Sequence, residues 1–434
     1  MEESSSRNHG LNMTEITLTE YKTQDFQPEE IPTSIGKTIH QNYSQYLEIK
    51  EPSFLSNKPW QLTPKGYIGT IPVTPDFTIR ILPKTEIKYV WQMLDYVENL
   101  NSLTIFEQLT HCDRLEDICD YLAQKLAQKV LSRAKQGLYR SYLSENDRLI
   151  ASRGKIQWHQ AARSPWEIRL PCRYNTHTSD IPENQILLWT LHQLGRTQNL
   201  LKAKTKTQLR QAHHALQGTI SLTPFTAQDC QNFTYHRLNQ DYKIIHQLCN
   251  FFLENLTPSH QTGTRKTLPF LINTAVLYEK FVHAWLKKNL ENKYFIKAQE
   301  KYQFTDKINY QIDLVLYERE TKQAIAVLDT KYKTPEKPSH ADLNQIIHYA
   351  LLKQTKRAIL IYPEALPYAV DQLSENIRVQ TIPFVLNDVS ATAGQQFLTC
   401  LFSQEKIPLN KEDLEKCHPS GETTSQIGAS SLPP

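Results

Sequence analysis

The sequence is poor in glycine, with 12 among its 434 residues, and contains no G-x-x-x-x-G-K-[ST] pattern. That glycine-rich loop cradles the phosphates of the nucleotide in P-loop proteins. Its absence excludes P-loop nucleotide hydrolysis by this chain. We also find no internal repeat, which argues against a solenoid.

Closely spaced cysteine pairs and long apolar runs are also missing. The seven cysteines are an odd number without a C-x-x-C pair, which favours reduced thiols over disulfides or a zinc site. We expect Cys112 and Cys119 to be core residues. No stretch approaches the roughly 18 apolar residues of a membrane span, and the start, MEESSSRNHGLNM, has no apolar signal-peptide core. We therefore expect a cytoplasmic protein without membrane contact.

The composition is that of a soluble globular protein, with 39% hydrophobic and 22% charged residues, and the length suits two or three domains. The net charge of +4 permits nucleic-acid binding without requiring it. Residues 184–227 contain no acidic residue. Such a run is usually a solvated helix face, and contact with a DNA backbone is the alternative. Its basic residues are Arg196, Lys202, Lys204, Lys206 and Arg210.

The first part of the chain predicts mixed strands and helices. Residues 1–25 are polar and serine-rich, so we expect a flexible tail. Residues 39–76 are broken by prolines, which favours short strands over helices. Residues 77–81 alternate apolar and polar side chains as in a half-buried strand, which Pro83 ends, and a helix should begin near Glu86.

The middle of the chain predicts helices. Apolar residues recur at helical spacing from Leu115 to Val130, which indicates a long helix that should continue through GLYRSYL. RGKIQW then returns to a strand-like pattern. Residues 184–216 predict a pair of helices interrupted near Gly195, and residues 242–256 predict another. We expect a linker at residues 257–266 because of their proline, glycine and serine.

Two apolar runs, residues 312–316 and 324–328, read as paired strands, and polar residues of catalytic type lie within the first and just after the second. Asp313 lies inside the first strand, and Asp329 and Lys331 end the second on the same face, because side chains alternate along a strand. If the strands pair, Asp313 comes close to Asp329. The alternative to a catalytic site is a hairpin that ends in solvated charged residues.

Two carboxylates beside a lysine make a site for a hard cation. Carboxylate oxygens suit Mg²⁺, which keeps several waters and binds substrate phosphates. Such a metal can activate water and stabilise the charge on a phosphodiester. We expect Asp313 and Asp329 to be metal ligands, and Lys331 to orient or deprotonate the attacking water or to neutralise the phosphate.

Two flanking helices strengthen this interpretation. Residues 277–286 (LYEKFVHAWL) predict an amphipathic helix that carries Glu279. Gln345 and Tyr349 are four residues apart and share a helix face. A helix with Glu, a strand with Asp, a strand with D-x-K and a helix with Q-x-x-x-Y resemble, in this order, the PD-(D/E)xK nuclease core of the RecB-like branch. Ile312 departs from that pattern, which has proline there.

Further segments ahead of this core extend the resemblance from about residue 66 to 363. They include GYIGTIPV before ILPK, GLYRSYL before SRGKIQW, LPCRYNTHTSDIPENQILLWTL and the LYEKF helix. In this order they resemble the McrC family, the nuclease subunits of McrBC systems that restrict DNA with modified cytosine. The resemblance implies a DNA endonuclease subunit that hydrolyses phosphodiesters of double-stranded DNA with Mg²⁺. It also implies an AAA+ GTPase partner of the McrB type.

Carried over to this sequence, the resemblance assigns catalytic roles to Asp313, Asp329, Lys331 and Glu279, the last through a water. Gln345 and Tyr349 would orient the site or contact DNA, and Lys333 could reach a phosphate or be merely solvated. Two alternatives remain, a non-cutting regulatory subunit of the GTPase and a stand-alone RecB-like nuclease.

The expected architecture is a multidomain α+β and α/β protein that ends in a PD-(D/E)xK restriction-endonuclease-like core. Its expected parts are a flexible tail (1–25), a partner-docking domain of strands and helices (26–165), a helical region (166–256), a linker (257–266), the nuclease domain (267–402) and a disordered tail (403–434).

Overall fold

The computed structural model describes residues 14–52, 59–74, 76–98, 114–197, 201–256, 269–303, 309–374, 376–386 and 391–403. Its contacts divide the chain into two compact units, Met1–Leu277 and Tyr278–Pro434. Both mix helices and strands, which agrees with the expected multidomain α/β architecture. No helix in this part of the chain is long and apolar enough to cross a membrane.

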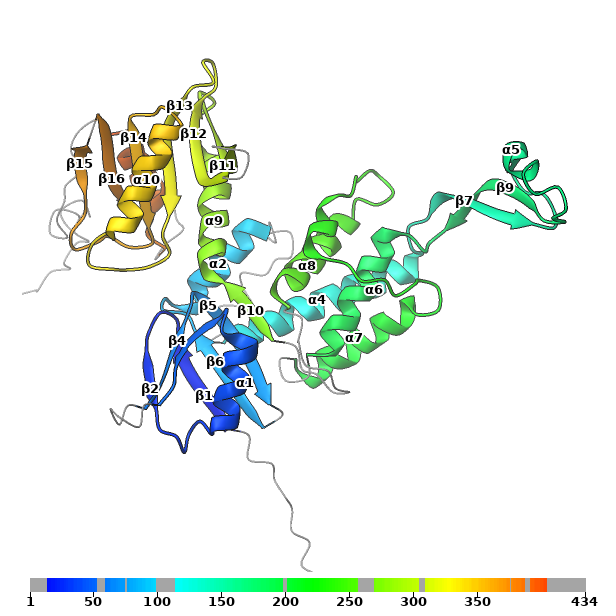
Figure 1. The fold of residues 1–434 in the computed structure, drawn as a ribbon, viewed down its shortest axis with the longest axis horizontal. Coiled ribbons are helices and arrows are strands. Elements are labelled where there is room, and N and C mark those ends of the chain that lie inside the picture. The colour runs from blue at the N-terminus through cyan, green and yellow to red at the C-terminus, as the bar shows by residue number, and fades with distance from the viewer. Residues whose placement is uncertain are drawn as a thin grey trace, which may run out of the picture. The chain divides into compact units, whose positions relative to one another are not determined.

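The first unit begins with two small sheets (Figure 1). In the four-stranded sheet, β1 runs parallel to β6, and β5 pairs antiparallel with β6 and β10. The three-stranded sheet has the order β2-β4-β3. The elements are β1 (Thr14–Thr19), β2 (Gln24–Phe26), α1 (Thr33–Tyr43), β3 (Leu47–Lys50), β4 (Trp60–Pro64), β5 (Tyr67–Thr74), β6 (Phe77–Leu82) and β10 (Phe270–Asn273).

This region corrects two predictions. Residues 14–25, expected to be flexible, contain β1 and most of β2, because Ile16 and Leu18 alternate inward and pack into the core. Part of the stretch expected to form only strands is helical: α1 buries Gly36, Ile39 and Tyr43 at helical spacing. A Cβ atom at position 36 would lie 2.4 Å from the Trp60 ring, so the close packing of α1 on β4 requires glycine there.

Helices follow these sheets in the first unit, and most were predicted. They are α2 (Ile87–Glu98), α4 (Leu115–Gln136), α6 (Pro182–Gly195), α7 (Ala203–Leu216), a 3₁₀ turn (Ala227–Gln231) and α8 (Tyr242–Asn255). The apolar stripe of α4, including Cys119, is buried as expected. However, α4 does not continue through GLYRSYL. It ends before Gly137, whose φ of +99° is readily adopted only by glycine.

A long hairpin, here called the arm, extends from the helices (Figure 1). It consists of β7 (Ser141–Leu149) paired antiparallel with β9 (Leu170–Thr178), and of β8 (Lys155–Ile156) and α5 (Trp158–Ala161) between them. The expected strand in RGKIQW shrinks to the two residues of β8. The arm also straddles residue 165, where we expected a domain boundary, because β7 and β9 pair across it.

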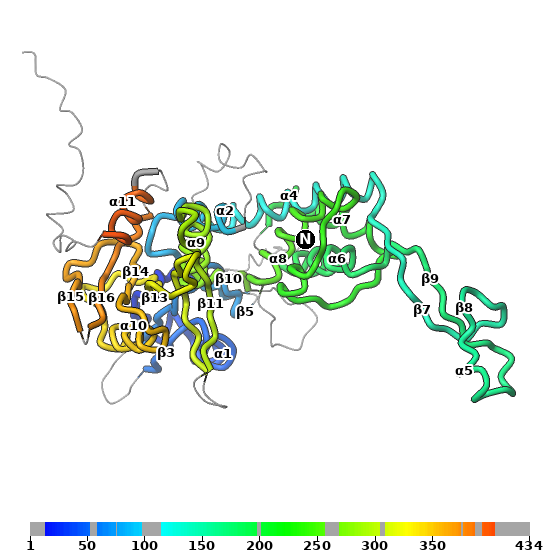
Figure 2. The backbone as a smooth tube through the Cα atoms, turned by 90° about the horizontal axis from the view of Figure 1, so that it is seen from above, coloured from blue at the N-terminus to red at the C-terminus, as the bar shows by residue number. Residues whose placement is uncertain are grey.

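The second unit is built on a six-stranded sheet of order β11-β12-β13-β14-β16-β15. β13, β14 and β16 are parallel and the outer pairs are antiparallel. Helix α10 covers one face, and α9 and α11 lie on the other (Figure 2). The elements are α9 (Thr274–Asn289), β11 (Tyr294–Gln303), β12 (Asn309–Glu318), β13 (Ala324–Thr330), α10 (His340–Leu352), β14 (Arg357–Tyr362), β15 (Asp371–Ser374), β16 (Ile377–Pro383) and α11 (Ala391–Phe402).

The border between the units differs from the predicted one. Phe270, Leu271 and Ile272 of β10 were assigned to the nuclease domain, but they are buried in the first unit beside β5. β10 pairs with β5 along the edge opposite β6, which places these residues in the first unit. The expected linker at 257–266, Cys112 and the expected tail after residue 403 lie outside the described residues.

Candidate active site

The site lies at the C-terminal end of β13, beside the middle of β12. The two strands pair antiparallel with Leu314 opposite Leu328, so the next position along each strand brings Asp313 opposite Asp329. The apolar neighbours on both strands are buried, which fixes this register. The expected proximity of the two carboxylates is thus present in the structure.

Asp329 is almost completely buried, with 1% of its surface exposed. Burial, followed by the charge of Asp313, raises the pKa of Asp329 to about 7. Burial and the charge of Glu279 also raise the pKa of Asp313. Among the described residues, the Asp313 carboxyl and the Lys331 ammonium contact the Asp329 carboxylate. Two acidic groups are therefore held together in a buried position, where a nearby cation would stabilise their charged forms.

Lys331 lies directly beside this pair. Its Nζ atom is 2.7 Å from Oδ2 of Asp329, on the strand face that alternation predicts. Burial opposes the charge of the ammonium, but Asp329 and two further aspartates hold the pKa of Lys331 above its ordinary value. The lysine is thus a fixed cation in a partly buried position.

Helix α10 holds Lys331 from the second side. The side-chain amide oxygen of Gln345 accepts a hydrogen bond from Lys331 Nζ at 3.1 Å, and its Nε2 donates to the Tyr349 hydroxyl at 3.0 Å. Gln345 and Tyr349 lie one helical turn apart, as their spacing predicts. The chain Tyr349–Gln345–Lys331–Asp329 orients the ammonium group. In this structure, both residues position the lysine.

Sequence reasoning missed Asp342, at the start of α10. Ser339 caps the helix by accepting a hydrogen bond from the Asp342 backbone N–H, and Lys333 and Ser339 both donate to the carboxylate. Despite its burial, these bonds lower the pKa of Asp342. Lys333 is therefore tied to Asp342. The S-x-x-D spacing, similar to a capping box, was the available signal.

Glu279 approaches from α9, and a second missed residue holds it there. Gln299 on β11 donates a hydrogen bond from Nε2 to Glu279 Oε1. Gln299 adopts a left-handed backbone with φ of +52°, at the position of β11 opposite Asp313. Burial raises the pKa of Glu279, and the charge of Asp329 adds to the shift despite the opposing bond from Gln299.

The residues present fit a Mg²⁺ ion that keeps most of its waters. Across the described ranges, no three His, Cys, Asp or Glu side chains are close enough to hold a metal by themselves. Asp313 and Asp329 offer two oxygen-donor groups, and Mg²⁺ sites that also take substrate phosphates often use only one or two carboxylates.

Fold and site define a two-unit α/β protein whose second unit carries an acidic pair and a lysine where the end of β13 lies beside β12. The model of one family, the McrBC 5-methylcytosine restriction system component, matches residues 62–363. This is more than half of the chain, and the protein belongs to that family. The resemblance to McrC-like subunits is thereby confirmed.

One solved structure adds support for the fold. The structure of a half-complex from a tetradecameric assembly of Thermococcus gammatolerans McrB AAA+ hexamers with bound McrC contains a chain 15% identical to this one. The TM-score is 0.52, over 89% of this chain and 99% of that chain. A second structure, the McrBC complex of the same organism, matches with 17% identity, 64% and 89% coverage and a TM-score of 0.39. No curated protein matches.

Proposed function

We propose that the protein is the DNA-cutting subunit of a modification-dependent restriction system, with a PD-(D/E)xK nuclease core in its second unit. The observation that carries the proposal is the convergence of Asp313, Asp329 and Lys331 where the end of β13 lies beside the middle of β12, with Lys331 Nζ 2.7 Å from Asp329. A hairpin that ended in solvated charges would not bury Asp329 to 1% exposure.

In this proposal Asp313 and Asp329 hold Mg²⁺ when both are deprotonated. The ion, when bound, supplies charge stabilisation on the phosphodiester and activation of water. Lys331 is held as a cation by Asp329 and Gln345, which suits it to orient a phosphate oxygen better than to accept a proton. Glu279, fixed by Gln299, orients a water beside the pair.

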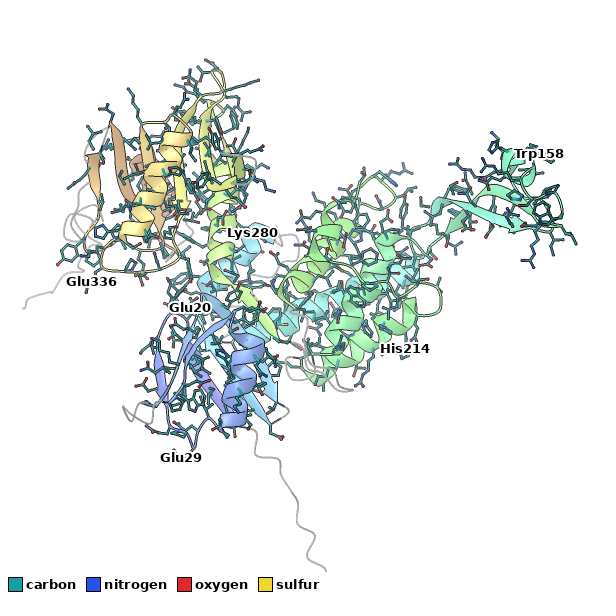
Figure 3. The ribbon with its side chains drawn as sticks, viewed as in Figure 1. Glu20, Glu29, Trp158, His214, Lys280 and Glu336 are labelled. Carbon is teal, nitrogen blue, oxygen red and sulfur yellow. The ribbon has the colours of Figure 1, made fainter. Side chains whose placement is uncertain are left out.

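We further propose that the partner is an AAA+ GTPase of the McrB type. The chain has no P-loop of its own, and the similar Thermococcus gammatolerans structure contains McrB AAA+ hexamers with McrC bound. The arm supports docking by the first unit, because it exposes large apolar side chains. Trp158, on α5 of the arm, is 68% exposed (Figure 3), and Trp166 and Ile168 are 78% and 86% exposed.

The test is purification with the GTPase partner, followed by cleavage of methylated and unmethylated DNA with Mg²⁺ and GTP. We expect cutting of the methylated DNA, and loss of at least about a thousandfold in rate for Asp329→Ala, because several kcal/mol of transition-state stabilisation disappear. Cutting without partner or GTP would favour the stand-alone nuclease. Stimulation of GTP hydrolysis without any cutting would favour the regulatory subunit.

A further inference from the structure

The strongest feature outside the acidic site is a pocket between α6 and α7 in the first unit. Its volume is about 510 Å³, within the range of roughly 300–1,000 Å³ typical of small-ligand sites. The pocket includes Arg196, at the end of α6, and Lys206 and Arg210, one turn apart on α7. No acidic side chain is among the described residues that line it.

These three cations have no ion-pair partner in the described part of the chain. The Arg196 guanidinium donates a hydrogen bond of 3.2 Å to the side-chain oxygen of Gln193, which carries no charge. Lys202, from the same basic stretch, differs because its Nζ lies 2.8 Å from Asp117 and it does not line the pocket. The basic stretch thus contains a lysine paired with Asp117, an exposed lysine outside the pocket (Lys204) and the cluster of three cations at the pocket.

Histidine rings form a second part of the wall. His192 lies between Trp189, stacked at 5.7 Å, and His213 at 6.2 Å, and His213 continues to His214, labelled in Figure 3. Burial lowers the pKa of His192 and of His213, aided by neighbouring positive groups, so both rings favour the neutral form. Nδ1 of His192 is buried and lacks a hydrogen-bond partner.

The remainder of the wall is apolar, with Leu191, Leu194, Leu201 and Leu209. Cationic side chains, neutral rings able to donate or accept hydrogen bonds, and apolar side chains in one pocket match the three parts of a nucleotide. Its phosphate needs positive charge, while its sugar and base need polar edges and apolar contact. A bare inorganic anion would leave most of this pocket unused.

We infer that the α6–α7 pocket binds a nucleotide phosphate, with Arg196, Lys206 and Arg210 on the phosphate and the His192–His213 wall beside the sugar or base. A DNA strand and a free nucleotide share this chemistry. The inference rests on the proposed function only in the choice of DNA as the first probe. It does not depend on Asp313 or Asp329, so cleavage and binding at the pocket can be tested separately.

The test measures binding of full-length protein to a short fluorescent DNA, single-stranded and duplex, in EDTA so that no cutting occurs. Lys206→Ala should weaken binding about tenfold, as expected for loss of a charged hydrogen bond, and should lower the slope of log affinity against log salt by about 1. The matched control is Lys204→Ala, which removes the same charge from an exposed position of α7 outside the pocket and should change the affinity less than about twofold.

A second arm uses dCMP as ligand and competitor to identify the source of the phosphate. If Lys206→Ala weakens DNA binding and dCMP does not bind, the ligand is a DNA strand. Binding of dCMP that is lost in Lys206→Ala supports a free nucleotide. The inference is overturned if Lys206→Ala and Arg210→Ala match Lys204→Ala for both probes.

Two further variants serve as controls, one for folding and one for catalysis. Lys206→Arg keeps the charge and should restore most of the DNA affinity, which a folding defect in Lys206→Ala would not allow. Asp329→Ala should bind DNA at the pocket like the wild type. If cleavage proves absent while Lys206-dependent binding persists, the proposed nuclease fails and the pocket stands.

Discussion

At the scale of single residues, the acidic pair makes stability depend on pH. The pKa of Asp329 is about 7 in the fold, against an ordinary value of 3.8. The folded protein therefore binds a proton there more tightly than the unfolded chain. Protonation of Asp329 therefore adds to the free energy of unfolding. This stabilisation is complete below about pH 4 and is lost as the pH rises to about 7.

Asp329→Asn should remove that dependence, since its amide stands in for the protonated acid. Without metal at pH 8, we expect the variant to be more stable than the wild type by a few kcal/mol, on the order of the pKa shift. The difference should vanish near pH 4. Denaturant melts across this range check it, and a difference that stays constant with pH would contradict the assignment. Mg²⁺ should stabilise only the wild type.

Lys331 separates metal binding from catalysis. Lys331→Ala should lose at least about a hundredfold in cleavage, because the oriented charge beside the phosphate is gone. It should retain Mg²⁺ binding, measured by calorimetry, since the ammonium is not a ligand. Lys333→Ala is the matched control, because that lysine is bound to Asp342 and should cost much less. Loss of metal binding in Lys331→Ala would indicate a structural role.

At the scale of elements, the arm carries an apolar surface that its own strands do not cover. Trp158→Ala combined with Trp166→Ala should weaken binding to the GTPase at least about thirtyfold, because buried tryptophans dominate protein interfaces. The melting temperature should hardly change, since both rings are exposed. Leu222→Ala, an exposed apolar residue outside the arm, serves as control. Unchanged affinity in a pull-down titration would place docking elsewhere.

The elements that sequence predicted best are those whose pattern is local. The alternation in β6 and the apolar runs of β12 and β13 can be recognised without knowing which distant residues they contact. The D-x-K pattern at the end of β13 likewise predicted that Lys331 lies beside Asp329. Asp342 and Gln299 were missed because their roles come from Lys333 and Glu279, which only the fold brings near. The helix α1 was missed because prolines around it suggested strands.

At the scale of the whole molecule, β10 links distant parts of the sequence. A fragment of residues 1–256 lacks β10, whereas a fragment of residues 1–273 contains it. Phe270, Leu271 and Ile272 are each under 5% exposed, so their loss should cost on the order of 5 kcal/mol. We expect the shorter fragment to melt much lower, by circular dichroism. Equal melting temperatures would show that β10 adds little to the first unit.

The same strand has a consequence for synthesis on the ribosome. β1, β5 and β6 emerge early, but β10, the edge partner of β5, follows only after the whole arm and the helices α4 to α8. At roughly 5–20 residues per second, the β5 edge stays open for about ten seconds or longer. An open strand edge invites pairing with other chains. During this interval, a chaperone that covers the β5 edge would protect the nascent protein from aggregation.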